Sequence, residues 1–196
     1  MPPKRRIVVY VATSADGFIA RKDGAVDWLE RPRPKGNYDW NAFYRSIDTC
    51  LLGRKTYDFS VRHGMPEPCV GKNNYVFSRT LQKAASPQVR VINEDVARFA
   101  ERLRKEKGKD VWLMGGAELV AAFVDCGQVD EFVIHVIPKM IGEGIPLVDQ
   151  GHRDLSLKLL ASKQFPDGVV RLHYAVRDEP RPRAAAGNRF RPRTAQ

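Results

Sequence analysis

Two successive glycines, Gly115 and Gly116, divide a short apolar run from a helix-forming one and are well placed to approach a ligand. The apolar run 111–114 predicts a buried strand, and the residues from Ala117 onward predict a helix. Glycine carries no side chain, so a ligand can lie against the backbone there. The free N–H groups and the dipole of the first helical turn, which includes Ala117 and Glu118, favour an anion. The segment is either a phosphate site or a tight strand-to-helix turn without a ligand.

A third glycine, Gly53, ends the apolar run 49–52 and is followed by Arg54, Lys55 and Thr56. Two cations at a predicted helix start oppose the helix dipole, and a bound phosphate would relieve that conflict. Arg54 can grip a phosphate through two N–H groups, and the Thr56 hydroxyl can donate to it. The alternative is a solvated basic turn. Two such sites in one chain indicate a ligand with more than one phosphate.

A further polar segment, residues 78–80, ends the strand-like run 74–77. Its hydroxyl, guanidinium and second hydroxyl suit an isolated phosphate, such as the 2′-phosphate of NADP. Ser78 and Arg79 are the candidate contacts. The alternative is a polar turn at the end of a strand.

Strands and helices alternate along the chain around these segments. Apolar or alternating stretches predict strands, and apolar residues at helical spacing predict helices. The predicted strands cover residues 7–12, 49–52, 74–77, 89–92, 111–114, 132–137, 158–165 and 169–176. Predicted helices begin near Asp39, after Gly53, after Asn93 as an N-cap, and after Gly116, the third being stopped by Gly108. We therefore predict an α/β fold, a three-layer α/β/α arrangement with a mixed, mostly parallel central sheet and an antiparallel C-terminal hairpin.

The composition is that of a single globular domain. The 196 residues are 43% hydrophobic and 29% charged, and no apolar stretch is long enough to span a membrane. The three cysteines, Cys50, Cys69 and Cys126, are far apart and odd in number. We expect reduced thiols, no disulfide and a cytoplasmic protein. The histidines show no metal-binding spacing, so no metal is expected.

The net charge of +10 makes its position along the chain important. Residues 1–6 carry +3 and residues 177–196 carry +4, which leaves +3 on residues 7–176. We predict a basic N-terminal extension (1–6), one domain (7–176), and a basic Pro/Arg/Ala-rich tail (177–196) without fixed structure. With so little charge on the body, neither nucleic acid nor a membrane is the expected partner.

Five short segments, in this order, resemble the dihydrofolate reductase-like superfamily, in particular the reductase domain of the bifunctional riboflavin-biosynthesis deaminase–reductases. They are residues 14–20, 51–57, 76–81, 114–119 and 138–147. The resemblance covers about residues 7–176 and implies a homodimeric reductase that uses NADPH on a small-molecule substrate. The sequence departs from the riboflavin deaminase–reductases in two ways. The zinc deaminase half is missing, and residues 58–64 do not match the acidic-Pro-x-Leu-Thr-x-Arg stretch of the riboflavin reductases.

The resemblance also implies roles for individual residues. The main chain at Ala12 and Ile19 would hold the nicotinamide carboxamide, and residues 21–38 match a mobile lid. Arg54, Lys55 and Thr56 would hold cofactor phosphates, and Ser78 and Arg79 would contact the 2′-phosphate. Gly115 and Gly116 would lie beneath the nicotinamide and the pyrophosphate. The implied cofactor-binding residues are Ala12, Ile19, Gly53, Arg54, Lys55, Thr56, Ser78, Arg79, Gly115, Gly116, Ala117 and Glu118.

Three residues are candidates on the substrate side. Asp39 begins the helix that carries the substrate-binding carboxylate in dihydrofolate reductases, and it is the predicted catalytic residue. Phe43, one turn on, would stack on a substrate ring, and His135 would reach the pocket from its strand. The alternatives are a helix N-cap for Asp39 and core packing for Phe43 and His135.

We therefore predict an NADPH-dependent reductase that transfers hydride to a pteridine- or pyrimidine-type substrate. It resembles 5-amino-6-(5-phosphoribosylamino)uracil reductase of riboflavin biosynthesis. One alternative is a dihydrofolate reductase. An alternative of another class is a non-catalytic nucleotide- or RNA-binding protein that uses its basic termini.

Overall fold

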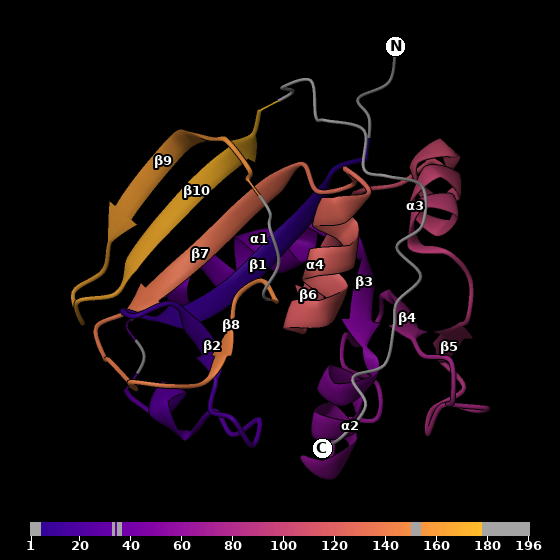
Figure 1. Ribbon diagram of the computed structural model, residues 1–196, viewed down its shortest axis with the longest axis horizontal. Coiled ribbons are helices and arrows are strands. Elements are labelled where there is room, and N and C mark those ends of the chain that lie inside the picture. Colours follow the sequence, from indigo (N-terminus) through magenta and orange to yellow (C-terminus); the bar gives the residue numbers. More distant parts are fainter. Residues whose placement is uncertain (1–4, 33, 35–36, 150–153, 178–196) are drawn as a thin grey trace.

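The structure, a computed structural model, describes residues 5–32, 34, 37–149 and 154–177. Eight strands form one sheet in the order β5-β4-β3-β6-β1-β7-β10-β9 (Figure 1). They are β1 (Ile7–Ser14), β3 (Ile47–Gly53), β4 (Asn73–Phe77), β5 (Val89–Ile92), β6 (Asp110–Gly115), β7 (Glu131–Ile137), β9 (Leu157–Gln164) and β10 (Val170–Val176). The first six are parallel, and β10 is antiparallel to both β7 and β9. Strands β2 (Phe18–Ala20) and β8 (Ile145–Pro146) form a separate antiparallel pair.

Helices cover both faces of the sheet. They are α1 (Trp40–Ser46), α2 (Arg54–Arg62), α3 (Val96–Lys105) and α4 (Ala117–Asp125), with 3-10 turns η1 (Asp27–Leu29) and η2 (Asn37–Asp39). Figure 1 shows α3 and α4 in front of the sheet and α1 behind it. One core cluster joins Phe99 and Phe123 to the sheet, and a second joins Tyr57 and Trp112 on the opposite face. The predicted three-layer fold is confirmed.

Apolar runs in β1 and β6 put these strands at the centre of the sheet. Ile7, Val9, Val111 and Leu113 are fully buried, as strands covered on both faces must be. Because β3, β6 and β1 are parallel neighbours, their carboxyl ends meet at one edge. In open α/β sheets that edge is where ligands bind.

The ends of α3 differ from the prediction. Asp95, and not Asn93, caps the helix, because its carboxylate accepts a hydrogen bond from the N–H of Arg98 at 3.0 Å. Asp95 directly precedes the first helical residue and so reaches the third N–H, whereas Asn93 lies two residues further out. The helix ends at Lys105, since Glu106 already has extended backbone, and not at Gly108.

The cysteine prediction is wrong for two of the three residues. Cys50 on β3 and Cys69 on the segment before β4 are joined as a disulfide, and both are fully buried. They are 19 positions apart, and the parallel pairing of β3 with β4 brings them together. Reduced thiols therefore no longer support the expected cytoplasmic location. Cys126 is a free thiol, and burial raises its pKa to about 11.

The packed body begins before residue 7, where the domain was expected to start. Arg5 is 5% exposed and pairs with Asp48. Its guanidinium also donates to the carbonyls of Leu103 and Lys109. Arg5 is thus a structural residue of the fold. Residues 1–4 and the predicted tail after residue 177 lie outside the described residues.

Candidate active site

The two glycine turns predicted to bind phosphate stand side by side. In the pairing of β3 with β6, Leu52 lies opposite Gly115. A Cβ placed on Gly53 would lie 3.5 Å from the carbonyl oxygen of Gly115 and from the nitrogen of Gly116. Helices α2 and α4 start directly after these glycines, so their N-terminal ends converge. Two sets of free N–H groups therefore face one place.

Gly116 and Thr56 form the narrowest part of this junction. A Cβ on Gly116 would come within 3.4 Å of the Thr56 hydroxyl oxygen. Gly115 has a φ of 110°, a conformation that favours glycine, and the peptide bond between Gly115 and Gly116 is cis. A hydroxyl donor and a bare backbone thus share the space in front of both helices.

The cations of the α2 turn have carboxylate partners. Arg54 pairs with Asp58 one helical turn on, at 2.7 Å. Lys55 pairs with Glu118 at 2.8 Å, which links the first turns of α2 and α4. The conflict between these cations and the helix dipole, predicted to be relieved by a phosphate, is thus offset by the protein's own acids. Because these pairs are solvent-exposed, they are weak and can rearrange around an anion.

Ser78 continues the same edge by one strand. It follows Phe77, which lies opposite Gly53 in the pairing of β3 with β4. The Ser78 hydroxyl accepts hydrogen bonds from the N–H groups of Thr80 and Leu81, as a turn-forming serine does. Arg79 is exposed beside it. The third predicted segment therefore lies next to the Gly53 turn.

A cavity of about 420 Å³ opens beside the carboxyl ends of β1 and β7. Four of its nine lining residues carry rings, which suits a flat ligand. It is lined by Tyr10, Ala12, Leu29, Arg31, Asn37, Tyr38, Trp40, His135 and Ile137. Of the residues predicted to hold the nicotinamide, Ala12 lines this cavity, opposite His135 in the sheet, and Ile19 lies half-buried on β2.

Two neutral polar groups meet in the cavity wall. His135 is 5% exposed, and burial, followed by the charge of Arg171, lowers its pKa to about 4. Burial raises the pKa of Tyr10 to about 12. The Tyr10 hydroxyl lies 3.4 Å from His135 Nε2. Both groups are therefore uncharged near neutral pH and are able to hydrogen-bond to a ligand.

Phe43, predicted to stack on the substrate, stacks instead on Tyr10. The ring centroids are 3.9 Å apart at an interplanar angle of 17°. Phe43 also contacts the edge of Trp112 and belongs to the core on this face. These contacts match core packing, and they hold the Tyr10 ring in the cavity wall.

Asp39 precedes α1 but does not cap it with its side chain. Its φ is 64°, and its carboxylate makes no bond to the helix. It accepts instead from Lys163 at 2.7 Å and from Arg171 at 3.0 Å. The hydrogen bond with Lys163, together with both positive charges, lowers the pKa of Asp39. The helix-cap alternative is therefore wrong, because partners on β9 and β10 take the carboxylate.

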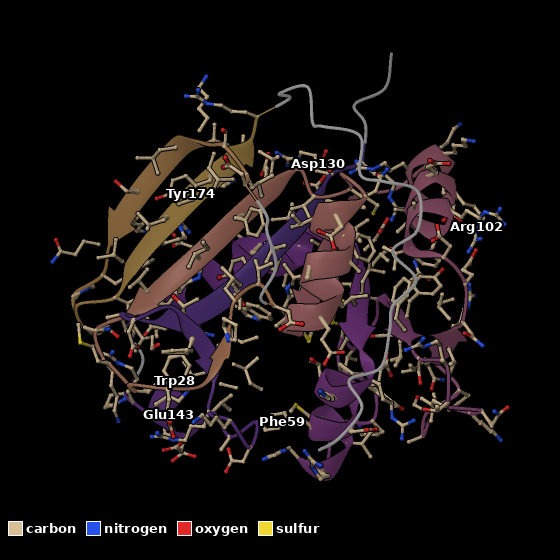
Figure 2. All side chains as sticks on the ribbon, viewed as in Figure 1. Trp28, Phe59, Arg102, Asp130, Glu143 and Tyr174 are labelled. Atoms are coloured by element: carbon tan, nitrogen blue, oxygen red, sulfur yellow. A yellow bond between two sulfur atoms is a disulfide. The ribbon has the colours of Figure 1, made fainter. Side chains whose placement is uncertain are left out.

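A second cavity of about 580 Å³ lies between residues 23–31 and the second half of α2. Phe59 and His63, stacked at 4.0 Å, form its α2 wall together with Arg62. Figure 2 places Phe59 on the side of α2 turned toward the segment that carries Trp28. The two cavities share Leu29 and Arg31, so they form neighbouring parts of one cleft. The predicted lid, residues 21–38, borders both, although its residues 33, 35 and 36 lie outside the described residues.

Sequence reasoning missed several residues around the cavity, including Tyr10, Tyr38 and Arg171. Tyr10 carried a usable signal, because it lies two positions from Ala12 in a strand and so shares its face. Arg171 carried none, since its place opposite His135 depends on the β7–β10 register.

This arrangement defines an α/β domain of the dihydrofolate reductase-like class, with glycine turns and a ring-lined cavity at the carboxyl edge of its sheet. The dihydrofolate reductase of Enterococcus faecalis shares the fold, with a TM-score of 0.65 at 16% identity over 88% of this chain and 97% of that one. The profile of the RibD C-terminal domain matches residues 5–171. The chain belongs to the RibD C-terminal domain family, and the predicted resemblance is confirmed.

Individual relatives agree with this assignment. The uncharacterized protein YwjB of Bacillus subtilis (strain 168) is 40% identical over 87% of this chain and 98% of its own length. A crystal structure from Shewanella sp. PV-4, of a protein assigned to riboflavin biosynthesis, has a TM-score of 0.79 at 25% identity, covering 88% of this chain and 99% of that one. The described residues include no helix with the length and apolar character of a membrane span.

Proposed function

We propose that this protein is an NADPH-dependent reductase that delivers hydride to a pyrimidine- or pteridine-type ring substrate. The convergence of the Gly53 and Gly116 turns beside a ring-lined cavity, in a RibD-type reductase domain, is the observation that carries the proposal. Two charged or polar sites at one sheet edge suit a cofactor with several phosphates. The adjoining cavity suits the ring that receives the hydride.

The residues present fit a dinucleotide with a 2′-phosphate. Gly115 and Gly116 leave bare backbone that a side chain would fill, and Thr56 adds a hydroxyl at that point. Lys55 and Arg54 would turn from their carboxylates toward the phosphates, and Ser78 and Arg79 would hold the 2′-phosphate. The first turn of α4, including Ala117 and Glu118, would face the pyrophosphate, and Ala12 and Ile19 the nicotinamide. NADPH, when bound, supplies the hydride.

On the substrate side, Tyr10 and His135 would orient the ring by hydrogen bonds while the cavity excludes water. Positioning of this kind supplies much of the rate in hydride transfer. Asp39 is our candidate for the catalytic residue of this site, and its ionised carboxylate, paired with Arg171, would orient the substrate. Phe43 would support the ring contact through Tyr10.

The ion pairs of Asp39 favour a riboflavin-type substrate over dihydrofolate. A substrate N–H group must compete with Lys163 and Arg171 for the carboxylate, which weakens recognition of a basic pterin ring. Arg31 and Asp167 form a further ion pair beside the cavity. Together with Asp39, Lys163 and Arg171 they carry a net charge of +1, which suits a neutral or anionic substrate better.

We also propose a homodimer that does not bind nucleic acid. Arg5 is buried against Asp48, which leaves it unavailable for the RNA-binding alternative. Arg6 is 50% exposed and pairs with Asp110 and Glu131. Deleting residues 178–196 tests the rest of that alternative, because a protein that bound RNA through its tail would lose RNA binding, whereas NADPH binding should persist unchanged. Analytical ultracentrifugation of the full chain tests the dimer.

The decisive experiment measures NADPH oxidation by absorbance with three substrates in parallel. We expect turnover with 5-amino-6-(5-phosphoribosylamino)uracil-type substrates and little with dihydrofolate or simple pterins. Calorimetric titration with NADPH supplies a readout that needs no substrate. A protein that binds NADPH but oxidises it with none of the three retains the cofactor proposal and loses the substrate proposal. A protein that binds no NADPH loses both.

A further inference from the structure

Asp167, in the turn between β9 and β10, contacts two residues that line the 420 Å³ cavity. The Tyr38 hydroxyl donates to its carboxylate at 2.5 Å. Arg31 forms an ion pair with the same carboxylate at 3.3 Å and also donates to the Asp167 carbonyl. Asp167 therefore contacts one residue in each of the two segments, 29–32 and 37–40, that form this wall of the cavity.

The backbone around Tyr38 needs such support. Asn37, Tyr38 and Asp39 have φ values of 45°, 58° and 64° in succession. This left-handed region is disfavoured for residues with side chains, most of all for a bulky one such as tyrosine. Conformations of this kind persist where surrounding contacts impose them. The turn must therefore be held from outside.

The β9–β10 hairpin supplies several of the outside contacts, and His135 on β7 supplies another. Besides the bond to Asp167, the Tyr38 ring meets the edge of Phe165 at a centroid distance of 5.1 Å. Asp39 pairs with Lys163 and Arg171. Without the hairpin contacts, the turn would relax and move the Tyr38 ring, which also contacts His135 at 5.9 Å.

Burial separates this contact from an ordinary surface ion pair. The side chains of Arg31 and Asp167 are 23% and 18% exposed, so water screens them little. Lys22 and Glu143, a pair that also joins residues 21–32 to a distant loop, are 68% and 70% exposed and line neither cavity. The second pair is a natural control for the first.

We propose that Asp167 is a positioning residue of the active site, which sets the substrate cavity by holding Tyr38 and Arg31 against the hairpin. The substrate part of this inference rests on the proposed reductase function, whereas the backbone part does not. Asp167 is not among the residues that line the cavity. Its effect passes through Tyr38 and Arg31.

The test compares Asp167→Ala with Glu143→Gln in the full chain. In the protein without ligands, we expect amide hydrogen exchange at residues 37–41 to accelerate about tenfold or more in Asp167→Ala alone. In steady-state assays, we expect KM for the ring substrate to rise about tenfold with kcat within about threefold of the original value, as for lost ground-state positioning. The Kd for NADPH should not move.

Tyr38→Phe is the second variant, because it removes one oxygen and keeps the ring. If Tyr38 acts through its hydrogen bond to Asp167, the double variant should behave like Asp167→Ala, because that change alone already removes the partner of both Tyr38 and Arg31. The two changes should therefore not add. Unchanged exchange at residues 37–41 in Asp167→Ala would overturn the proposal, and so would full additivity.

Faster exchange with an unchanged KM would also overturn it, because Asp167 would then be a structural residue only. Failure of the proposed function would look different. The original protein would then turn over none of the substrates, and the exchange comparison would still decide whether Asp167 holds the turn.

Discussion

The two halves of the candidate site differ in the material that forms them. The edge proposed to bind the cofactor consists of backbone at helix starts, with exposed charges around it; the Lys55 side chain is 86% exposed. The cavity proposed to bind the substrate has buried or half-buried rings in its wall, and His135 is 5% exposed. One half should therefore depend on space near the backbone and on salt, and the other on shape, neutral hydrogen bonds and pH.

The largest effect is expected at Gly116. In Gly116→Val, the added methyl groups would fill the space between the backbone and the Thr56 hydroxyl, which is already 3.4 Å from a Cβ. NADPH binding should weaken by more than about 100-fold, or about 3 kcal/mol or more, in a calorimetric titration. Far-ultraviolet circular dichroism should remain that of the folded protein, and Gly116→Ala should have an intermediate effect. Unchanged affinity in a folded Gly116→Val would mean that the glycines only make a turn.

Asp39→Asn tests whether the Asp39 carboxylate takes part in the chemistry. The asparagine keeps the size of the side chain but loses the ion pairs with Lys163 and Arg171. We expect turnover to fall about 100-fold, or about 3 kcal/mol in the transition state, with NADPH affinity unchanged. Stability should move little, because the Asp39 side chain is 41% exposed. Turnover equal to that of the original protein would remove Asp39 from the mechanism.

The buried His135 should make folding stability sensitive to acid. Its pKa is lowered to about 4 in the folded protein, against 6.5 when exposed. The unfolded chain therefore binds the proton first as pH falls, and stability present above pH 6.5 is lost toward pH 4. Between pH 7 and pH 5 the loss should be about 2 kcal/mol. Urea unfolding at both pH values measures it, and His135→Gln should lack this part of the pH dependence. The same slope in both proteins would contradict a neutral, buried imidazole.

The smallest expected effect is cofactor choice. We expect NADPH to bind about tenfold more tightly than NADH, or about 1.4 kcal/mol, because Ser78 and Arg79 would contact the 2′-phosphate. Arg79→Ala should narrow the difference, and the exposed Arg98→Ala on α3 should not. Raising the salt concentration should reduce the preference as well. Equal affinities for the two cofactors would falsify the 2′-phosphate assignment while leaving the glycine turns untested.

The two glycine turns were predictable because their signals are local. A glycine after an apolar strand needs only neighbouring residues to be recognised, and the α/β alternation follows from hydrophobic periodicity. The parallel order of β3 and β6 then brings the two turns together. The structure changed one feature of this half, since Arg54 and Lys55 have carboxylate partners.

Local patterns were enough to predict most strands, the helices and the glycine turns, because the spacing of apolar residues and the conformational freedom of glycine act over a few positions. The family was predicted from the resemblance of five short segments to known reductases. Three contacts could be known only from the tertiary structure. They are the disulfide between Cys50 and Cys69, the pairing of Arg171 with His135 across the sheet, and the ion pair of Asp39 with Arg171 on the hairpin. Asp39 and Arg171 are 132 positions apart in the sequence. Strand register decides such contacts, and register is the outcome of packing the whole core rather than of any local pattern.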